Sequence, residues 1–168
     1  KAKFPNTELV MYDPVSASAL LEANETCFGQ PVVPNYRFDL ARVIVSFDAD
    51  FLGTWISPIE YAAQYAQRRK ITDIKKAEKS RHIQVESHMS LTGSNADHRI
   101  LVKPSAQGAA IVTLYNAVAS ATGRPTVSGP QLSGKEAEKI KAAAKELLAH
   151  RGASLVVSGS NNTGEQIL

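Results

Sequence analysis

Four short apolar runs constrain the fold of this chain more than any other feature of its sequence. They are rich in valine or isoleucine and do not alternate cleanly between apolar and polar residues; they span residues 9–12, 43–47, 83–85 and 155–157. Such runs are typical of strands that are buried on both faces of a parallel sheet. Segments with helical periodicity separate them, and this alternation predicts an α/β fold. We therefore expect an open, mostly parallel sheet of about four strands, with helices on both faces.

Capping residues mark where the first two helices should begin. Asp13 can cap the first helix, with Pro14 in its first position, and Gly29 can close its end. The second helix begins at a capping box, a serine followed three residues later by a glutamate that reaches back to it: Ser57 and Glu60. Its buried stripe should consist of residues at helical spacing: Ile59, Ala62, Ala63 and Ala66.

Three further helix signals follow. One helix should span about residues 105–121, and another should begin at the capping box of Ser133 and Glu136. Asn162 and Glu165 have the spacing of a cap and third position of one more helix, a few residues before the last residue given. We therefore expect a fragment of a longer multidomain chain.

Composition narrows the class of protein. The chain has 168 residues, of which 43% are hydrophobic and 21% charged, and residues 1–168 suit a single globular domain. The single cysteine, Cys27, excludes a disulfide framework or a multi-cysteine metal site within these residues. No apolar run approaches the ~18 residues of a membrane span, so we expect no direct membrane insertion. The basic stretch at 68–81 lacks aromatic residues, so we expect no nucleic-acid partner.

Ligands of an open parallel sheet bind beyond the carboxyl ends of its strands, so the loops there are candidates. Asp13 could ligate a metal or act as a base, although capping is the simpler interpretation. Asp48 and Asp50 could bind a hard cation, although hydrogen bonding at a strand end is the simpler interpretation. The small polar residues of 158–164 could cradle an anion on free backbone N–H groups.

The loop after the third apolar run is the most polar part of the chain. Ser90, His88 and Asp97 could be combined into a hydrolase triad, but no nucleophile elbow accompanies them. His82, His88 and His98 share no zinc-ligand spacing with a cysteine, so we expect no zinc site.

Three phrases of the sequence resemble the molybdopterin oxidoreductase (dimethyl sulfoxide reductase) superfamily. They occupy residues 35–39, 50–55 and 90–97, and Pro104 and Gln107 follow the last of them. The resemblance is closest to one branch, the fused molybdopterin-like and iron–sulphur subunit of alternative complex III. It implies a Rossmann-like layer in a membrane-bound, quinol-oxidising respiratory complex at the periplasmic face of the bacterial inner membrane. The implied partners are the remaining domains of its own subunit and the other subunits of that complex.

The resemblance also implies where relatives bind molybdopterin guanine dinucleotide, and this chain departs from them there. A Gly-Ser-Asn loop of relatives is replaced by Asp48-Ala49-Asp50, their arginine by His88, and their guanine-reading aspartate by Gln107. We therefore interpret seven residues as a vestigial cofactor site: Asp48, Asp50, His88, Thr92, Gln107, Ser160 and Asn161.

The function expected from the resemblance is that of a structural scaffold. We expect no cofactor, no metal and no catalytic residue in this domain, with iron–sulphur clusters elsewhere in the parent subunit. Such a scaffold should expose an apolar patch of more than a few hundred Å². The alternatives are a domain that still binds molybdopterin guanine dinucleotide and, from another class, a small hydrolase that uses Ser90 and His88.

Overall fold

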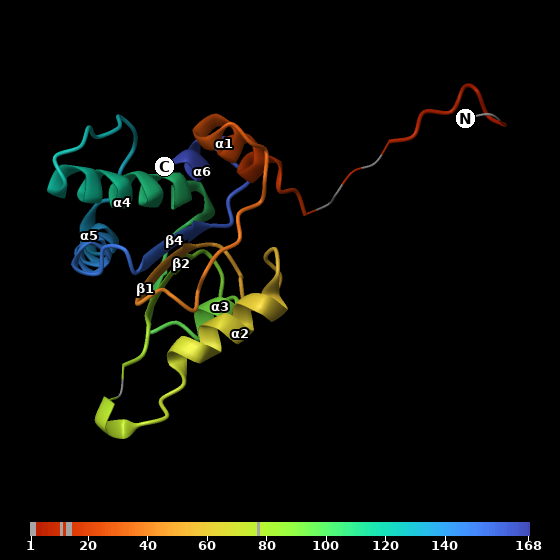
Figure 1. Ribbon diagram of the computed structural model, residues 1–168. Helices are drawn as coiled ribbons and strands as arrows, with labels where there is room; N and C mark the ends of the chain where they lie inside the picture. Colours follow the sequence, from red (N-terminus) through yellow and green to blue (C-terminus); the bar gives the residue numbers. More distant parts are fainter. Residues whose placement is uncertain (1–2, 11, 13–14, 77) are drawn as a thin grey trace.

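The computed structural model describes residues 3–10, 12, 15–76 and 78–168 and has the expected α/β fold (Figure 1). Its strands are β1 (Val43–Phe47), β2 (Arg81–Glu86), β3 (His98–Leu101) and β4 (Ser154–Ser158). All four are parallel and form one open sheet in the order β3-β2-β1-β4. The strands predicted at 43–47, 83–85 and 155–157 are confirmed, because they lie within β1, β2 and β4.

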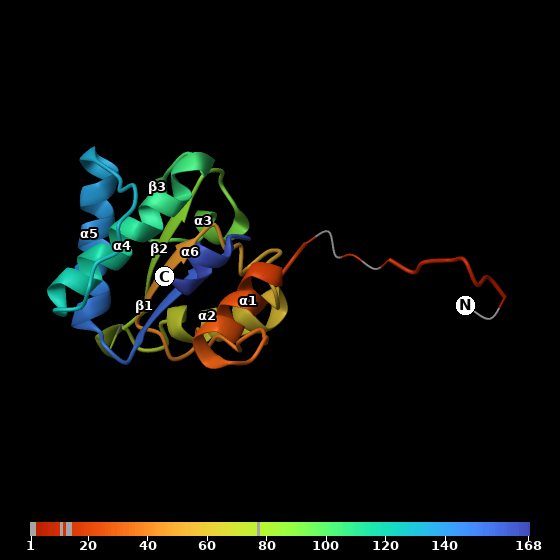
Figure 2. The ribbon, with the colours of Figure 1, turned by 90° about the horizontal axis from the view of Figure 1, so that it is seen from above.

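Helices cover both faces of this sheet. The described residues form α1 (Ser18–Phe28), α2 (Pro58–Arg69), α3 (Leu91–Ser94), α4 (Gln107–Ala121), α5 (Gly134–Ala149) and α6 (Thr163–Ile167), with 3-10 turns η1 (Ile74–Lys76) and η2 (Pro104–Ala106). Figure 1 shows α1, α4, α5 and α6 on one side of the sheet and α2 and α3 on the other. Seen from above, α4 lies against α5, and α1 lies against α6 (Figure 2).

The core under α4 and α5 contains apolar side chains of the sheet and of both helices. Val45 and Val85 of the sheet pack in one cluster with Ile111, Leu114 and Ile140 of these two helices. All five side chains are buried. Removal of this apolar surface from water stabilises the layer, since burial of each such side chain contributes about 1.5–3 kcal/mol.

The stripe predicted for α2 is wrong. Ile59, the largest residue of that stripe, is 89% exposed, and the buried residues of α2 are Tyr61 and Tyr65. The two tyrosines stand one helical turn apart and pack with Phe38 and Phe51 into an aromatic cluster. A stripe of alanines would leave the space under α2 unfilled, so the helix turns its aromatic face to the sheet.

The strand predicted at 9–12 is also wrong. Leu9, Val10 and Tyr12 belong to no strand and are 78%, 76% and 84% exposed, whereas Met11 lies outside the described residues. Figure 1 shows residues 3–10 well away from the sheet. An apolar run becomes a strand only where another strand offers its backbone groups, and composition does not specify that neighbour.

The predicted helix starts at Asp13 and Asn162 have different outcomes in the structure. The predicted cap at Asp13 lies outside the described residues, and α1 begins only at Ser18, although it ends at Gly29 as expected. The start at Asn162 is confirmed, because its Oδ1 accepts a hydrogen bond from the N–H of Glu165 at 3.1 Å. β3 was not predicted, because its residues form no apolar run and most of them face solvent.

Candidate functional site

The loops that matter for ligand binding meet at the carboxyl edge of the sheet. The order β3-β2-β1-β4 reverses between β1 and β4, which makes their loops the two sides of the topological switch point. Open α/β sheets bind their ligands in the crevice at this point. The arrangement of Asp48, after β1, and Gly159, after β4, therefore decides whether a crevice exists.

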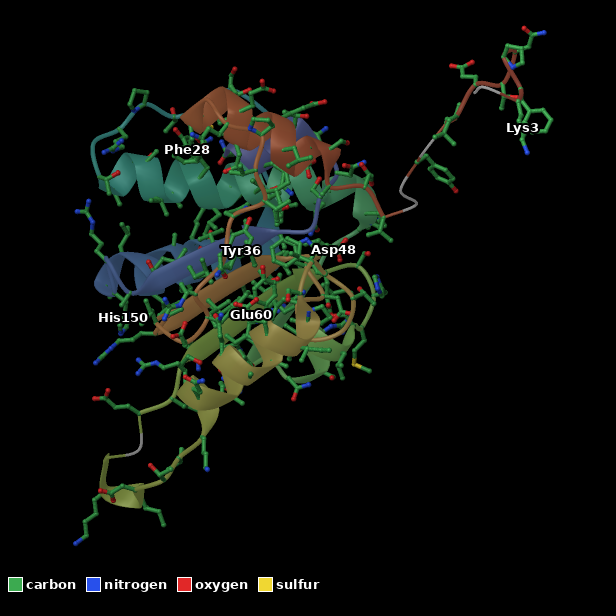
Figure 3. The ribbon with its side chains drawn as sticks, turned by 45° about the vertical axis from the view of Figure 1, so that its right-hand side comes forward. Lys3, Phe28, Tyr36, Asp48, Glu60 and His150 are labelled. Atoms are coloured by element: carbon green, nitrogen blue, oxygen red, sulfur yellow. The ribbon has the colours of Figure 1, made fainter. Side chains whose placement is uncertain are left out.

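These two loops are in direct backbone contact. The N–H of Gly159 donates to the carbonyl of Phe47 at 2.8 Å. A Cβ at position 159 would lie 2.5 Å from the carbonyl oxygen of Asp48 and 3.0 Å from the Cα of Ala49, so only glycine fits there. Asp48 itself has a φ of 51°, and it turns the chain sharply at the end of β1 (Figure 3). At the switch point the backbone of Gly159 therefore packs directly against the backbone of Asp48 and Ala49.

Two predicted site residues, Asp50 and Thr92, bind each other. Oδ1 of Asp50 accepts hydrogen bonds from the backbone N–H of Thr92 at 3.0 Å and from its hydroxyl at 2.8 Å. The same hydroxyl oxygen accepts the N–H of Leu52 at 2.9 Å, and Thr92 is fully buried. The pair joins the loop that follows β1 to the loop that follows β2. Asp50 therefore has a hydrogen-bonding role at a strand end, which was the simpler of the two interpretations of its sequence position.

A second polar cluster lies at the end of β2. Glu86 is 1% exposed and forms an ion pair with Arg99 of β3. It also accepts a hydrogen bond from Ser90 Oγ at 2.7 Å, and that hydroxyl accepts the N–H of Gly93 at 2.9 Å. The carboxylate of Glu86 fills the place that a Cβ on Gly93 would occupy. Ser90 is thus a helix cap held by a buried carboxylate.

The hydrolase triad is not assembled. Ser90 follows β2 at the carboxyl edge, whereas Asp97 precedes β3 and receives the backbone N–H of His82, near the start of β2. At about 3.3 Å of rise per residue, most of the length of β2 separates the two residues. His88 is exposed. Ser90 and Asp97 thus lie at opposite ends of β2, and the triad of Ser90, His88 and Asp97 is not formed.

Asp97 instead organises the amino-terminal edge of the sheet. Its carboxylate pairs with Arg69 at 2.5 Å and with Lys79 at 2.7 Å. Partial burial would raise the pKa of Asp97, but hydrogen bonds from Arg69, Lys79 and the N–H of His82 outweigh it and hold that pKa well below its ordinary value. Two basic residues of the stretch at 68–81, Arg69 and Lys79, therefore form ion pairs within the fold.

Sequence reasoning missed a buried polar row on β2. His82 and Gln84 are fully buried, and the hydroxyl of Tyr65 lies 3.0 Å from His82 Nδ1. His82 Nε2 lies 3.2 Å from Gln84 Oε1. Burial lowers the pKa of His82 to about 4, and burial raises the pKa of Tyr65 to about 12. His82 and Gln84 alternate with Ile83 and Val85. This alternation, with a period of two, is the sequence pattern that could have predicted polar side chains on one face of β2.

The remaining predicted residues lie around the amino ends of α1, α4 and α6. Gln107 Nε2 lies 3.4 Å from the carbonyl of Val85. Ser160 Oγ accepts the N–H of Asn162 at 3.2 Å, and Asn161 Oδ1 accepts the N–H of Ala19 at 3.5 Å. These side chains join loops to helices within the chain.

An acidic side chain stands at the amino end of α4. Oε1 of Glu165 lies 2.6 Å from the position that a Cβ on Gly108 would take, in the first turn of that helix. The amino end of a helix favours negative charge and is a common place for phosphates. The carboxylate of Glu165 therefore lies where the phosphate of a ligand would bind at the amino end of α4.

Two cavities lie elsewhere in the part of the chain that the structure describes. The larger has a volume of about 730 Å³ and runs between β4 and the helices α1, α4, α5 and α6. The smaller, of about 320 Å³, lies between β3 and α5. None of the seven predicted site residues lines either cavity.

Within residues 3–10, 12, 15–76 and 78–168, no group of three His, Cys, Asp or Glu side chains is placed to hold a metal ion. No helix in the part of the chain that the structure describes has the length and hydropathy to cross a membrane. No protein-family model and no curated protein matches this chain. What is established of its class is the fold, an open four-stranded parallel sheet with helices packed against it.

Proposed function

We propose that this chain is a cofactor-free structural domain of the molybdopterin oxidoreductase type, within a quinol-oxidising respiratory complex at the periplasmic face of the bacterial inner membrane. The three sequence phrases that resemble that superfamily support the family, and the parallel sheet agrees with it. The close contact of Gly159 with Asp48 is the observation that supports the absence of a bound cofactor in this proposal. The implied partners are the other domains of its subunit and the other subunits of the complex.

The residues at the carboxyl edge do not fit a molybdopterin guanine dinucleotide. A pyrophosphate needs room at the switch point and free N–H groups. Here Gly159 abuts Asp48, and Asp50 has taken the N–H of Thr92. Glu165 stands at the amino end of α4, where its carboxylate would repel a phosphate. The polar groups of this edge are used to join loops, as a scaffold requires.

One observation favours the alternative of a nucleotide-binding domain. Gln107 is 7% exposed, and its Oε1 has no hydrogen-bond partner among the described residues. A buried acceptor without a partner costs about 1–3 kcal/mol, and a donor on a bound base would remove that cost. The seven-residue site is therefore tested against a guanine nucleotide.

The test is a calorimetric titration with GDP up to millimolar concentration. We expect no saturable heat. A single saturable site that Gln107→Leu abolishes would contradict the scaffold proposal and favour the alternative. Gln131→Leu is the matched control, because Gln131 is exposed and lies in the loop before α5.

A further inference from the structure

An apolar groove runs beside β4; it is the cavity of about 730 Å³ and is called the β4 groove below. Pro34 and Tyr36, from the connection after α1, form part of its wall together with Val156 of β4. Apolar side chains of three helices form the rest: Leu20, Phe28, Leu114, Val118 and Leu148. Phe28, labelled in Figure 3, is 79% exposed at the end of α1. Contiguous exposed apolar surface of this kind is typical of an interaction site.

The two ends of the β4 groove differ in charge. Arg124 follows the end of α4 and Arg151 precedes β4, and both line the groove and are exposed. Neither guanidinium forms an ion pair with any described residue. Glu165 of α6, which follows β4, lines the groove as well. A carboxylate is therefore attracted to the arginine end and repelled from the α6 end.

The segment before α1 carries groups that are complementary to this groove. Leu9, Val10 and Tyr12 are highly exposed, and Glu8 stands at the amino end of their run. Glu8 forms no ion pair with any other described residue. Figures 1 and 2 show residues 3–10, called the arm below, extending away from the rest of the chain, so the arm does not cover the chain's own groove. Residues 11, 13 and 14 lie outside the described residues.

The run that begins at Glu8 and the β4 groove also agree in length. β4 has five residues, which span about 17 Å at about 3.3 Å per residue. Residues 8–12 are also five and reach the same distance when extended. With Glu8 at the arginine end, Leu9, Val10 and Tyr12 would lie along the apolar part of the groove. The carboxylate of Glu165 disfavours the opposite direction.

We propose that the β4 groove of one copy of this chain binds the arm and Tyr12 of a second copy, with Glu8 of that copy paired to Arg124 and Arg151. The exchange is reciprocal: each copy supplies one arm and one groove, so two copies form a closed dimer with two equivalent contacts. A second copy is favoured over an unrelated partner because the chain itself carries both halves of the contact. It is favoured over the chain's own arm because that arm points away from its own groove.

Sedimentation equilibrium of the chain of residues 1–168 tests for the dimer. We expect a single monomer–dimer equilibrium with a Kd below about 100 µM. A chain that stays monomeric at this concentration would overturn the proposal. Association beyond the dimer would also overturn it, because reciprocal exchange leaves no arm and no groove free.

Charge reversal tests the pairing and separates a second copy from the chain's own arm. Glu8→Arg, and separately the double variant Arg124→Glu with Arg151→Glu, should each weaken the dimer at least about tenfold, since like charges then meet at both contacts. An equimolar mixture of the two variant chains should dimerise again, because every arm then meets a groove of opposite charge. If mixing restores no dimer, the arm does not cross between copies and the proposal is wrong.

The controls for charge reversal lie at exposed positions outside the groove. Glu25→Arg on α1 matches Glu8→Arg, and Lys141→Glu with Lys145→Glu on α5 matches the double arginine variant. Neither control should change the Kd of the dimer. Equal weakening by the control variants and by the variants at Glu8, Arg124 and Arg151 would refute the specific pairing.

Leu9→Ser tests the apolar half of the contact. It should weaken the dimer at least about tenfold, because each dimer loses two buried leucine side chains. Ile59→Ser is the matched control, since Ile59 on α2 is about as exposed as Leu9 and lies outside the groove. Both residues are exposed within one copy, so neither substitution should lower the thermal stability of the dilute monomer. Equal dimer affinities of Leu9→Ser and Ile59→Ser would overturn the proposal.

Discussion

Oδ1 of Asp50 accepts both the backbone N–H and the hydroxyl of Thr92, at 3.0 and 2.8 Å, across 42 residues of sequence. This one carboxylate joins the loop after β1 to the loop after β2. Two residues that the family resemblance assigns to a cofactor are thereby used to hold the edge of the sheet together.

Thr92→Val should therefore destabilise the domain. The substitution keeps the shape of the side chain but removes a hydroxyl that donates to Asp50 and accepts from Leu52. A loss of about 1–3 kcal/mol is expected, because buried partners remain unsatisfied. Urea denaturation measures it. Thr126→Val, at an exposed position, is the control; equal effects of the two variants would contradict the role of Thr92.

Gly93→Ala should be more harmful than an ordinary glycine substitution. The carboxylate of Glu86 stands where the new methyl group would go, and that carboxylate is fixed by Arg99 and Ser90. Overpacking of this kind costs about 1–3 kcal/mol. Gly129→Ala is the matched control, since its nearest contact would be 3.6 Å from Val112. Thermal unfolding that ranks the two alanines equally would refute the contact.

Stability should fall as the pH drops from about 6.5 to about 4. Burial lowers the pKa of His82 to about 4, so the unfolded chain binds a proton in this window that the folded chain does not. The unfolded state is favoured as the pH falls, by an amount of the order of 3 kcal/mol over the window. Urea midpoints measured between pH 4 and 7 check this. His82→Gln should flatten the profile, and His98→Gln, at an exposed position, should leave it unchanged.

Asp97→Asn should cost more than loss of a surface ion pair. Asp97 and Arg69 have side-chain exposures of 11% and 19%, and the substitution leaves Arg69 without the carboxylate that pairs with its charge. Losses of about 3–5 kcal/mol are typical for fully buried pairs, so somewhat less is expected here. Glu138→Gln breaks an exposed pair with Lys141 and should change the free energy of unfolding by less than about 0.5 kcal/mol. Similar effects of both variants in denaturant melts would refute the distinction.

The parallel sheet was predictable because doubly buried strands have apolar runs, as β1 and the centre of β2 do. β3 was not, because it has the sequence His-Arg-Ile-Leu and only Ile100 of it is buried. The apolar run at 9–12 led to a wrong prediction of a strand. Leu9, Val10 and Tyr12 are apolar or aromatic, but no described strand pairs with them. The spacing of apolar residues predicted the helix α2 but not its buried side. That side contains Tyr61 and Tyr65, because these two side chains fill a space that exists only once the sheet has folded.

It was predictable that these loop residues gather at one edge of the sheet, but the contacts that their side chains make there were not predictable. Loop residues after parallel strands gather at one edge by topology, which brought Asp48, Asp50 and Thr92 to the same end of the sheet. Whether a carboxylate faces a ligand or another loop depends on long-range contacts. The contact of Glu165 with Gly108 spans more than 50 residues, and no local pattern encodes it.

We propose that Gly159, Asp48 and Asp50 leave no room for a nucleotide at the switch point of the sheet. The backbone amide resonances of Gly159, Asp48 and Thr92, followed by NMR during addition of GDP, report on this crevice. We expect no saturable shift of these resonances up to millimolar nucleotide. Saturable shifts centred on these three amides would mean that a nucleotide enters the crevice and that the proposal is wrong.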